Sequence, residues 1–349
     1  MSATCKPESV LEAPAPDFSI RQAEVIARQI FDIEAVAKPL ASERDQNFRL
    51  STPEGDEWVL KIANPAEDRA ILDLQTRALA HIAHADPELR VPRVMATADG
   101  IAMHEIEDDR GRRFITRILS FLPGRTLDQA AVEPALERDV GVTTARLARA
   151  LRDFRHPASR HELLWDLTQA GGLRRHTHHI GEPGDRRLVE AVLERFEMEV
   201  LPALMQQRAQ LIHNDVSLLN TLVEGRRVVG VIDFGDLIHA PLVCDLAVPI
   251  CELTEAQANP DSTAAAITAG YHSVTPLLDD ELRLIFDLVA TRCAMCIAVA
   301  HWRVGDHPEN AEYIMAGVPE MGERLERMRE TGPDRMYTAL RAACSVAET

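Results

Sequence analysis

The stretch from Leu211 to Asp236 constrains what this chain can fold into more than any other part of it. It reads LIHNDVSLLNTLVEGRRVVGVIDFGD, with two apolar runs joined by a turn at Gly225. Such a pattern is typical of two strands joined as a hairpin. Asp215 and Asn220 stand before the first run, and Asp233 follows the second. Three polar residues therefore flank a hairpin-like pair of apolar runs.

The types and spacing of these residues favour phosphoryl transfer. That reaction needs one carboxylate near the acceptor hydroxyl, and an amide oxygen with a second carboxylate for magnesium. Asp215, Asn220 and Asp233 supply the three groups in the order H-x-D-x-x-x-x-N, then D-F-G. Any one of them alone would indicate only a turn, since Asp and Asn are common there. Together they predict Asp215 as the catalytic residue, and Asn220 and Asp233 as Mg²⁺ ligands.

Length and charge narrow the class of protein. At 349 residues the chain is long enough for two domains. Its 55 acidic residues outnumber its 38 basic ones, which gives a net charge of −17. That balance argues against a nucleic-acid binder, because such proteins need a basic face. An acidic surface also suits a cationic small substrate.

Cysteine usage and hydropathy predict a soluble, cytoplasmic protein. The six cysteines lack the spacing of a small disulfide framework, so we expect them to be reduced. Cys293 and Cys296 have the C-x-x-C form, but in an Ala-rich apolar segment their expected role is core packing. No segment offers about 20 continuous apolar residues, and the start of the chain lacks a basic segment followed by an apolar run. No membrane association is expected.

Three regions are expected along the chain. Residues 1–18, which contain Pro, Ala and Glu, are interpreted as a flexible tail without a core. Residues 19–122 form a nucleotide-binding lobe, in which a helix begins after Ser19 and three short runs within residues 35–62 predict an antiparallel meander. Residues 123–349 repeat Ala, Leu, Arg and Glu at helical spacing, which predicts a mostly helical lobe. Because this lobe contains the motif with Asp215, it is expected to be the catalytic and acceptor-binding lobe.

Four residues of the first lobe are candidates for nucleotide contact. Lys61 lies between apolar neighbours where kinase-like enzymes carry a phosphate-binding lysine; the alternative is a lysine on the solvent face of an edge strand. Ser42 and Asn47 belong to a connection without glycine, so they are either phosphate donors or members of an ordinary hairpin turn. Ser120 stands in the expected hinge at residues 119–124, where backbone groups could meet the nucleotide base.

The partner of Lys61 is left open. The helix predicted over residues 66–84 carries Gln75 at the place where kinases carry a glutamate that orients this lysine. A glutamine hydrogen-bonds an ammonium group but adds no charge. Either Gln75 or an acid such as Asp73 is therefore expected to pair with Lys61.

The second lobe allows several structural expectations. Residues 187–210 and 310–329 are each predicted to be one helix. Residues 174–179, with Arg and His side by side, are interpreted as a solvated loop rather than a metal site. Asp245 is expected to serve as a helix cap or as a buried brace behind the metal-binding loop.

The catalytic motif resembles that of the aminoglycoside phosphotransferase superfamily, and other strings resemble its hydroxylysine kinase group. These strings are Asp45-Gln-Asn-Phe48, Leu60-Lys-Ile-Ala-Asn64, Leu119-Ser-Phe-Leu-Pro-Gly124, Gly270-Tyr-His-Ser-Val-Thr-Pro-Leu277 and His307-Pro-Glu-Asn310. The resemblance spans roughly residues 19–335. It implies a bilobal, protein-kinase-like α+β fold with a small antiparallel-sheet lobe and a mostly helical lobe. It also implies transfer of the γ-phosphoryl group of ATP or GTP, with Mg²⁺, to a hydroxyl of an amino-bearing metabolite such as 5-hydroxylysine.

The acceptor leaves more alternatives open. An amino acid needs an acid for its ammonium group and a base for its carboxylate, and Asp236, Glu252 and Arg292 are the candidates. A structural role is the alternative for all three, since a buried arginine more often meets a protein acid. Two other functions fit the same residues. One is an aminoglycoside or other amino-alcohol phosphotransferase, and the other is a catalytically silent nucleotide-binding pseudokinase, suggested by the absent loop glycines and by Gln75.

Overall fold

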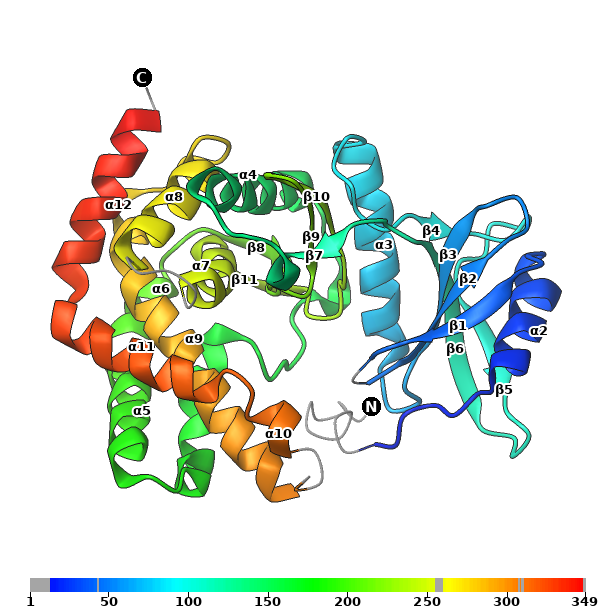
Figure 1. Ribbon diagram of the computed structural model, residues 1–349, viewed down its shortest axis with the longest axis horizontal. Helices are drawn as coiled ribbons and strands as arrows, with labels where there is room; N and C mark the ends of the chain where they lie inside the picture. The colour runs from blue at the N-terminus through cyan, green and yellow to red at the C-terminus, as the bar shows by residue number, and fades with distance from the viewer. Residues whose placement is uncertain (1–12, 43, 255–259, 307, 309–310, 348–349) are drawn as a thin grey trace. The chain divides into compact units, whose positions relative to one another are not determined.

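A computed structural model describes residues 13–42, 44–254, 260–306, 308 and 311–347 (Figure 1). The chain divides into two compact units, Met1–Pro123 with Phe154–Leu164, and Gly124–Asp153 with Trp165–Thr349. Some predicted features lie outside the described residues: residues 1–12 of the tail, and His307, Glu309 and Asn310 of the last string.

The first unit is built on an antiparallel sheet in the order β1-β2-β3-β6-β4, with β5 also paired to β6. Its strands are β1 (Val36–Leu40), β2 (Gln46–Ser51), β3 (Glu57–Ile62), β4 (Val94–Met95), β5 (His104–Glu107) and β6 (Arg113–Ser120). Its helices are α2 (Ile20–Phe31), α3 (Arg69–Ala85) and the short 3₁₀ helix η2 (Pro157–Ser159). The predicted meander and both predicted helices are confirmed, whereas β5 was not predicted.

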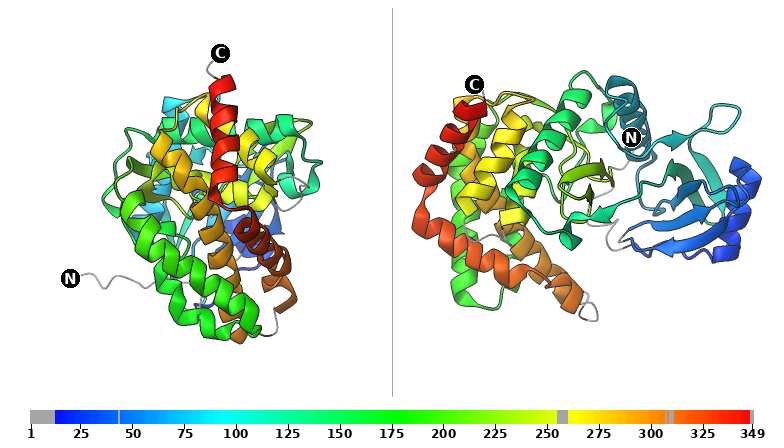
Figure 2. Two further views of the ribbon diagram at one scale, coloured as in Figure 1. Left: turned by 90° about the vertical axis from the view of Figure 1, so that its left-hand side faces the viewer. Right: turned by 45° about the horizontal axis from the view of Figure 1, so that its top comes forward.

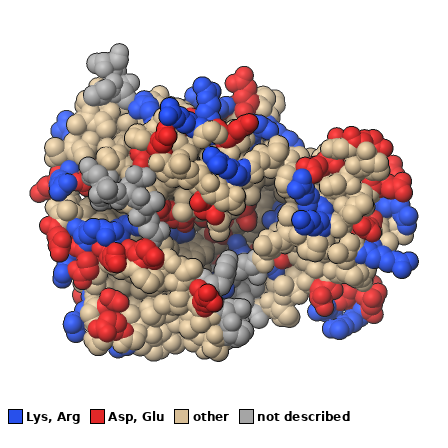
Figure 3. Space-filling view, viewed as in Figure 1, with Lys and Arg blue, Asp and Glu red and all other residues tan. Residues whose placement is uncertain are grey.

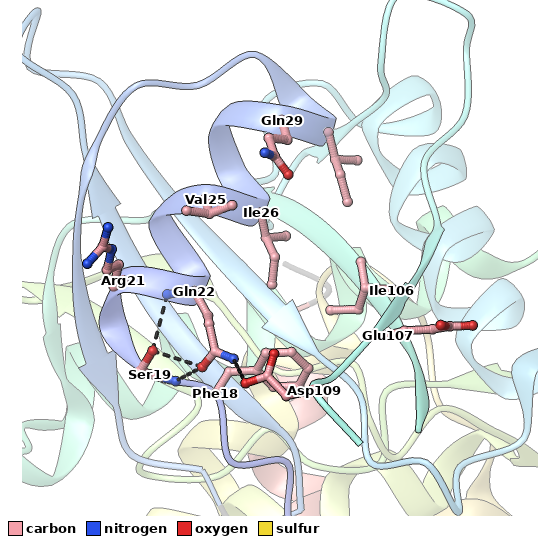
Figure 4. Close-up of a pocket in the computed structure, with 11 residues that line it drawn as sticks. Phe18, Ser19, Arg21, Gln22, Val25, Ile26, Gln29, Ile106, Glu107 and Asp109 are labelled. Carbon is pink, nitrogen blue, oxygen red and sulfur yellow. Dashed lines mark hydrogen bonds between the residues drawn. The ribbon is translucent and has the colours of Figure 1, made fainter. Parts of the chain in front are cut away.

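Helix α2 covers part of this sheet. Its first turn is closed by a capping box in which Ser19 and Gln22 bond each other's backbone N–H groups. Ala23, Ala27 and Phe31 face the sheet core, in which Phe48 and Leu60 are fully buried. A shallow pocket of about 420 Å³ lies where α2 meets β5 and the following turn (Figure 4).

Residues 154–164 return to the first unit after α4, which the sequence did not predict. His156 explains the return, because its Nε2 lies 3.0 Å from Oδ2 of Asp73 on α3. The same carboxylate is ion-paired with Arg77, and these partners together lower the pKa of Asp73 against the effect of its burial. Asp73, a candidate partner for Lys61 on sequence grounds, is thus engaged elsewhere.

The second unit is mostly helical (Figures 1 and 2). Its helices are α4 (Pro134–Leu151), α5 (Pro183–Arg195), α6 (Leu201–Leu204), α7 (Ala247–Thr254), α8 (Pro260–His272), α9 (Asp279–Asp306), α10 (Ala311–Ile314), α11 (Val318–Thr331) and α12 (Pro333–Ala347). Shorter turns are η1 (Leu127–Gln129), η3 (Leu167–His179), the π-helical η4 (Phe196–Val200) and η5 (Leu242–Leu246). Helices α11 and α12 pack against α9 (Figure 2).

Two small sheets complete the second unit. Strands β7 (Arg125–Thr126), β9 (Thr221–Glu224) and β10 (Arg227–Val231) form one in the order β10-β9-β7, and β8 (Ala209–Ile212) pairs with β11 (Ile238–Pro241) in the other. The small antiparallel sheet of the first unit and the helices of the second confirm the α+β fold predicted from the sequence.

Three local predictions were wrong. Residues 187–210 form α5, η4 and α6 and then enter β8, rather than one helix. Residues 310–329 are divided between α10 and α11 by a turn at Gly317, whose φ is +81°. Residues 174–179 are the last residues of the 3₁₀ helix η3 rather than a loop, although Arg174, Arg175 and His178 are exposed as predicted. His176 stacks on Trp302 of α9 with ring centres 4.2 Å apart. Packing against α9 thus orders a segment whose composition is that of a loop.

Helices α4 and α8 cross at two glycines. A Cβ on Gly141 would lie 1.9 Å from the carbonyl oxygen of Ile267, and a Cβ on Gly270 would lie 2.0 Å from that of Arg138. Backbone atoms of a helix cannot move aside singly, so a larger residue would force the helices apart. Helix α4 also packs on β8 and β10. The crossing therefore supports β8, which precedes Asp215, and β10, which precedes Asp233. It also gives Gly270 a physical role.

Acidic and basic side chains are interspersed on the face shown in Figure 3. Among the described residues, no helix is both long and apolar enough to cross a membrane.

Candidate active site

The β9–β10 hairpin brings the two halves of the catalytic motif together. Thr221 on β9 pairs with Val231 on β10, and the N–H of Ile232 donates to the carbonyl of Asn220 at 2.9 Å. Asn220 thus lies opposite Ile232, one residue before Asp233. Because of this register, Asn220 and Asp233, which are 13 positions apart in the sequence, lie at the same end of the hairpin.

Asp215 and Asn220 are in direct contact. Nδ2 of Asn220 donates to Oδ2 of Asp215 at 2.5 Å and lies 3.3 Å from the Asp215 carbonyl. The amide nitrogen is therefore engaged, which leaves the amide oxygen for a cation. Of the two oxygens of the Asp215 carboxylate, Asn220 binds Oδ2 and not Oδ1.

Asp233 ends the hairpin in the left-handed region, with φ +57°. Its Oδ1 accepts the N–H of Gly235 at 3.0 Å, and the residue is exposed. An amide oxygen and an exposed carboxylate at one end of a hairpin are ligand types that suit Mg²⁺, which usually retains waters and phosphate oxygens for its other positions. The described residues contain no cluster of three or more His, Cys, Asp or Glu side chains that could hold a metal by themselves. The donor set therefore fits an ion brought in with a nucleotide.

His213 connects the motif's two ends. Its Nδ1 accepts the N–H of Asp215 at 3.2 Å, and its ring packs edge-to-face on Phe234 with centres 4.6 Å apart. Complete burial lowers the pKa of His213 to about 4, so the ring is neutral at physiological pH. Because Nδ1 accepts, the proton sits on Nε2. The first residue of H-x-D thus holds both the Asp215 backbone and the D-F-G turn.

Two further acids brace the catalytic loop from α7 and the preceding turn. Oδ1 of Asp245 accepts the N–H of Asn214 at 2.8 Å, and Oε2 of Glu252 accepts the N–H of Leu218 at 2.7 Å. Burial raises the pKa of Asp245 to about 7, and burial also raises that of Glu252. Of the two roles expected for Asp245, a helix cap or a buried brace, the structure shows a buried brace, and it supports the catalytic loop.

The surroundings of Asp215 carry an excess of negative charge. Its own burial, and then Asp236, Glu252 and Asp233, raise its pKa well above the usual range, while Arg292 opposes the rise. Four carboxylates around one guanidinium favour the arrival of cations. A divalent ion and a substrate ammonium group are the two cations that the predicted chemistry would bring.

The first unit places the candidate nucleotide contacts in different environments. Lys61 and Asn47 are paired residues of β3 and β2, and Oδ1 of Asn47 is buried without a hydrogen-bond partner among the described residues. Ser42 is exposed. Oγ of Ser120 accepts the N–H of Arg93 at 2.8 Å, so it joins β6 to the segment before β4.

An acid, rather than Gln75, pairs with Lys61. Nζ of Lys61 lies 3.7 Å from Oδ2 of Asp45, whose Oδ1 accepts the N–H of Asn64 at 3.1 Å. Gln75 instead accepts from Nη2 of Arg117 at 2.9 Å. Asp45 was overlooked as the partner because it precedes β2 rather than lying on α3. The register of β2 against β3, which pairs Gln46 with Ile62, could have indicated it.

The acceptor candidates all lie around Asp215, as their effects on its pKa show. Asp236 is buried, and Glu252 has one oxygen engaged by the loop. Arg292 on α9 is 6% exposed, with its guanidinium carbon 4.6 Å from the ring centre of Trp165. Trp165 was not predicted to belong to the site. It lies about 50 residues before the motif, so no local spacing could indicate it.

Residues 36–283 match the model of the phosphotransferase enzyme family, and the chain belongs to that family. It is 28% identical to hydroxylysine kinase of Danio rerio over 334 residues, which cover 92% of this chain and 94% of that protein. It is also 28% identical to hydroxylysine kinase of Mus musculus over 342 residues, 91% of each chain. The chain is thus a small-molecule kinase with an alcohol group as acceptor.

Solved structures with the same fold include two small-molecule kinases. The amicoumacin kinase hAmiN, in complex with AMP-PNP and Ca²⁺, superimposes with a TM-score of 0.70 at 16% identity, covering 89% of this chain and 94% of that one. A microcompartment-associated aminopropanol kinase gives 0.69 at 18% identity, covering 90% and 98%. At such identities the similarity establishes the fold alone.

Proposed function

We propose that this chain transfers the γ-phosphoryl group of ATP or GTP to the hydroxyl of 5-hydroxylysine, with Mg²⁺ as the divalent ion. The observation that carries the proposal is its similarity, over at least nine-tenths of its length, to proteins named hydroxylysine kinase. The complete set of Asp215, Asn220 and Asp233 supports turnover rather than silent nucleotide binding.

Asp215 is the catalytic residue of this proposal. Asn220 holds its Oδ2, so Oδ1 orients the acceptor hydroxyl and takes its proton. The acceptor oxygen forms a bond to the γ-phosphorus as the bond from that phosphorus to the β–γ bridging oxygen breaks, and the nucleoside diphosphate leaves. Positioning and charge neutralisation supply most of the rate in such reactions.

The remaining candidate residues bind the two substrates. Oδ1 of Asn220 and the Asp233 carboxylate would hold Mg²⁺, which would supply positive charge against the phosphates. Lys61 binds a phosphate oxygen, with Ser42, Asn47 and the backbone at Ser120 as further nucleotide contacts.

The acceptor lies among the buried charges of the second unit. The carboxylates of Asp236 and Glu252 favour its ammonium groups, and the guanidinium of Arg292 contributes a positive charge beside Asp215. A carboxylate-rich site is also what an aminoglycoside or amino-alcohol kinase requires, so these acceptors are the main rivals.

An assay of nucleoside diphosphate release tests the proposal. ATP and GTP are each supplied with Mg²⁺ and with 5-hydroxylysine, ethanolamine, homoserine, choline or kanamycin. The expected result is the highest kcat/KM with 5-hydroxylysine. A higher value with kanamycin or an amino alcohol would transfer the proposal to that acceptor, whereas nucleotide binding without release for any acceptor would favour the pseudokinase. Replacing Mg²⁺ by EDTA should abolish release.

A further inference from the structure

Arg292 is a buried cation, and two of its three guanidinium nitrogen atoms have no hydrogen-bond partner in the part of the chain that the structure describes. It lies on α9 with 6% of its surface exposed, and its Nε and Nη1 are buried with no hydrogen-bond acceptor among the described residues. Leaving buried donors of a charged group unsatisfied is costly. Such a side chain is maintained against that cost when a ligand supplies the missing acceptors.

The groups around Arg292 are engaged elsewhere or are uncharged. Of the two nearby acids, Asp215 is bonded by Asn220 and Glu252 by the N–H of Leu218. The thiol of Cys296 is also near, but burial raises its pKa to about 12, so it carries no charge at neutral pH. The protein thus supplies negative potential near the guanidinium without filling its hydrogen-bonding positions.

Trp165 fixes the position of this guanidinium. The ring centre lies 4.6 Å from the guanidinium carbon, a cation–π distance. The carbonyl of Trp165 in turn accepts Nδ2 of Asn214 at 3.2 Å, beside Asp215. An aromatic face attracts a cation but leaves its N–H donors unbonded. Trp165 therefore links the position of Arg292 to that of the catalytic loop. It leaves the N–H donors of the guanidinium available to a planar anion.

A carboxylate of the acceptor fits this position better than a nucleotide phosphate does. The nearby carboxylates of Asp215 and Glu252 repel a polyanion, but they suit a zwitterion whose single carboxylate is accompanied by ammonium groups. Guanidinium groups recognise carboxylates through paired N–H donors. An amino alcohol would leave the buried donors without partners. Unpaired buried donors reject a substrate more strongly than a missing apolar contact does.

We propose that Arg292, seated on Trp165, binds the carboxylate of the acceptor and makes this enzyme selective for hydroxylated amino acids over amino alcohols. This inference rests on the proposed function, because it concerns the acceptor of the same site. Arg292 is a binding residue, and Trp165 is a positioning residue that acts through it.

The test compares 5-hydroxylysine with its decarboxylated analogue, 1,5-diaminopentan-2-ol, which keeps both amines and the hydroxyl. The wild-type enzyme should prefer the amino acid by about 100-fold in kcat/KM, and Arg292→Met should reduce that preference to a few-fold through a higher KM for 5-hydroxylysine. The KM for the nucleotide should stay unchanged. Trp165→Leu should reduce the preference by an intermediate amount, and Trp165→Phe should retain most of it.

Arg283 provides a matched control on the same helix. Its guanidinium stacks on Tyr337 at 4.1 Å, but the residue is exposed and pairs with Asp279. Arg283→Met should leave the substrate preference unchanged. Equal loss for both acceptors, or a raised KM for the nucleotide, in Arg292→Met would overturn the inference.

A binding measurement on the wild-type enzyme keeps the inference testable if Arg292→Met does not fold. L-lysine should raise the unfolding temperature and compete with the acceptor, whereas cadaverine, which lacks the carboxylate, should do so at least about 10-fold more weakly. Equal binding of the two would overturn the inference even if 5-hydroxylysine is phosphorylated. If homoserine rather than 5-hydroxylysine is the acceptor and Arg292→Met raises its KM alone, the named substrate fails and the inference stands.

Discussion

The catalytic loop from Asp215 to Asn220 and the β1–β2 connection from Ala41 to Asn47 are proposed to serve the same reaction, yet they are built differently. In and beside the loop, the backbone N–H groups of Asp215, Asn214 and Leu218 donate to the side chains of His213, Asp245 and Glu252, respectively. The described part of the connection contains an exposed Ser42, and its Asp45 contacts Lys61 at 3.7 Å and accepts the N–H of Asn64.

The difference indicates where preorganisation is needed. Charge moves at the acceptor oxygen, so the carboxylate that takes its proton must be fixed before the substrate arrives. Phosphates carry charge before and after transfer, so the groups that contact them need less preorganisation. We therefore expect substitutions in the loop and in the connection to affect different kinetic constants.

The largest effect should come from Asp215→Ala, which removes the proton acceptor. We expect kcat to fall about 10³-fold with little change in nucleotide affinity, measured by turnover and by nucleotide titration. The unfolding temperature should not fall, because the variant removes one of four crowded carboxylates. Activity within 10-fold of wild type would contradict the catalytic assignment.

Lys61→Met should act on the donor instead. Loss of a phosphate-binding cation should lower kcat/KM for the nucleotide about 100-fold and leave the KM for the acceptor nearly unchanged. Asp45→Asn is the matched comparison, since it keeps the lysine and removes only a partly exposed ion pair; we expect about a 2- to 5-fold change. Equal losses in the two variants would show that Asp45 itself contacts the nucleotide or its metal ion.

Asp245→Ala tests whether the loop depends on its brace. The variant leaves the N–H of Asn214 buried without an acceptor, which should lower the free energy of unfolding by about 1 to 3 kcal/mol. A displaced Asp215 should also lower kcat about 10-fold. Denaturant unfolding and steady-state kinetics measure the two effects. Unchanged kcat in a destabilised variant would show that Asp245 stabilises the fold without contributing to catalysis.

The smallest expected effect is a shift in the pH at which activity rises. Burial, followed by Asp236, raises the pKa of Asp215, and the reaction needs its deprotonated form. Activity should therefore rise with pH through a limb above the usual range of aspartate. Asp236→Asn removes a like charge, so this limb should move to lower pH. A limb that stays in place or moves upward in the kcat/KM profile would argue that another group titrates.

The sequence was sufficient for features that depend on local spacing. Asp215, Asn220 and Asp233 are recognisable because the β9–β10 hairpin brings them together within one short segment. The pairing of Lys61 with Asp45 was missed because the kinase pattern directs attention to α3, where Gln75 is taken by Arg117. Trp165 depends on tertiary packing against α9, which no local pattern encodes.

The helix crossing at Gly141 and Gly270 was unpredictable for the same reason. Each glycine has an ordinary helical neighbourhood in the sequence, and only the approach of α4 to α8 excludes a side chain there. Gly270 stands in one of the strings that resemble the family, but that resemblance does not show why a glycine is needed there.

Two backbone conformations in the catalytic motif bear on how this enzyme can evolve. Asn214 and Asp233 have φ values of +66° and +57°, a region that costs a residue with a side chain about 1 to 2 kcal/mol and glycine almost nothing. Glycine at either position would make the chain more robust. It would also remove the Asn214 amide that holds Trp165, or a proposed metal ligand. A screen that rewards thermal tolerance alone would accept both changes, so directed evolution of this scaffold should select for turnover in every round.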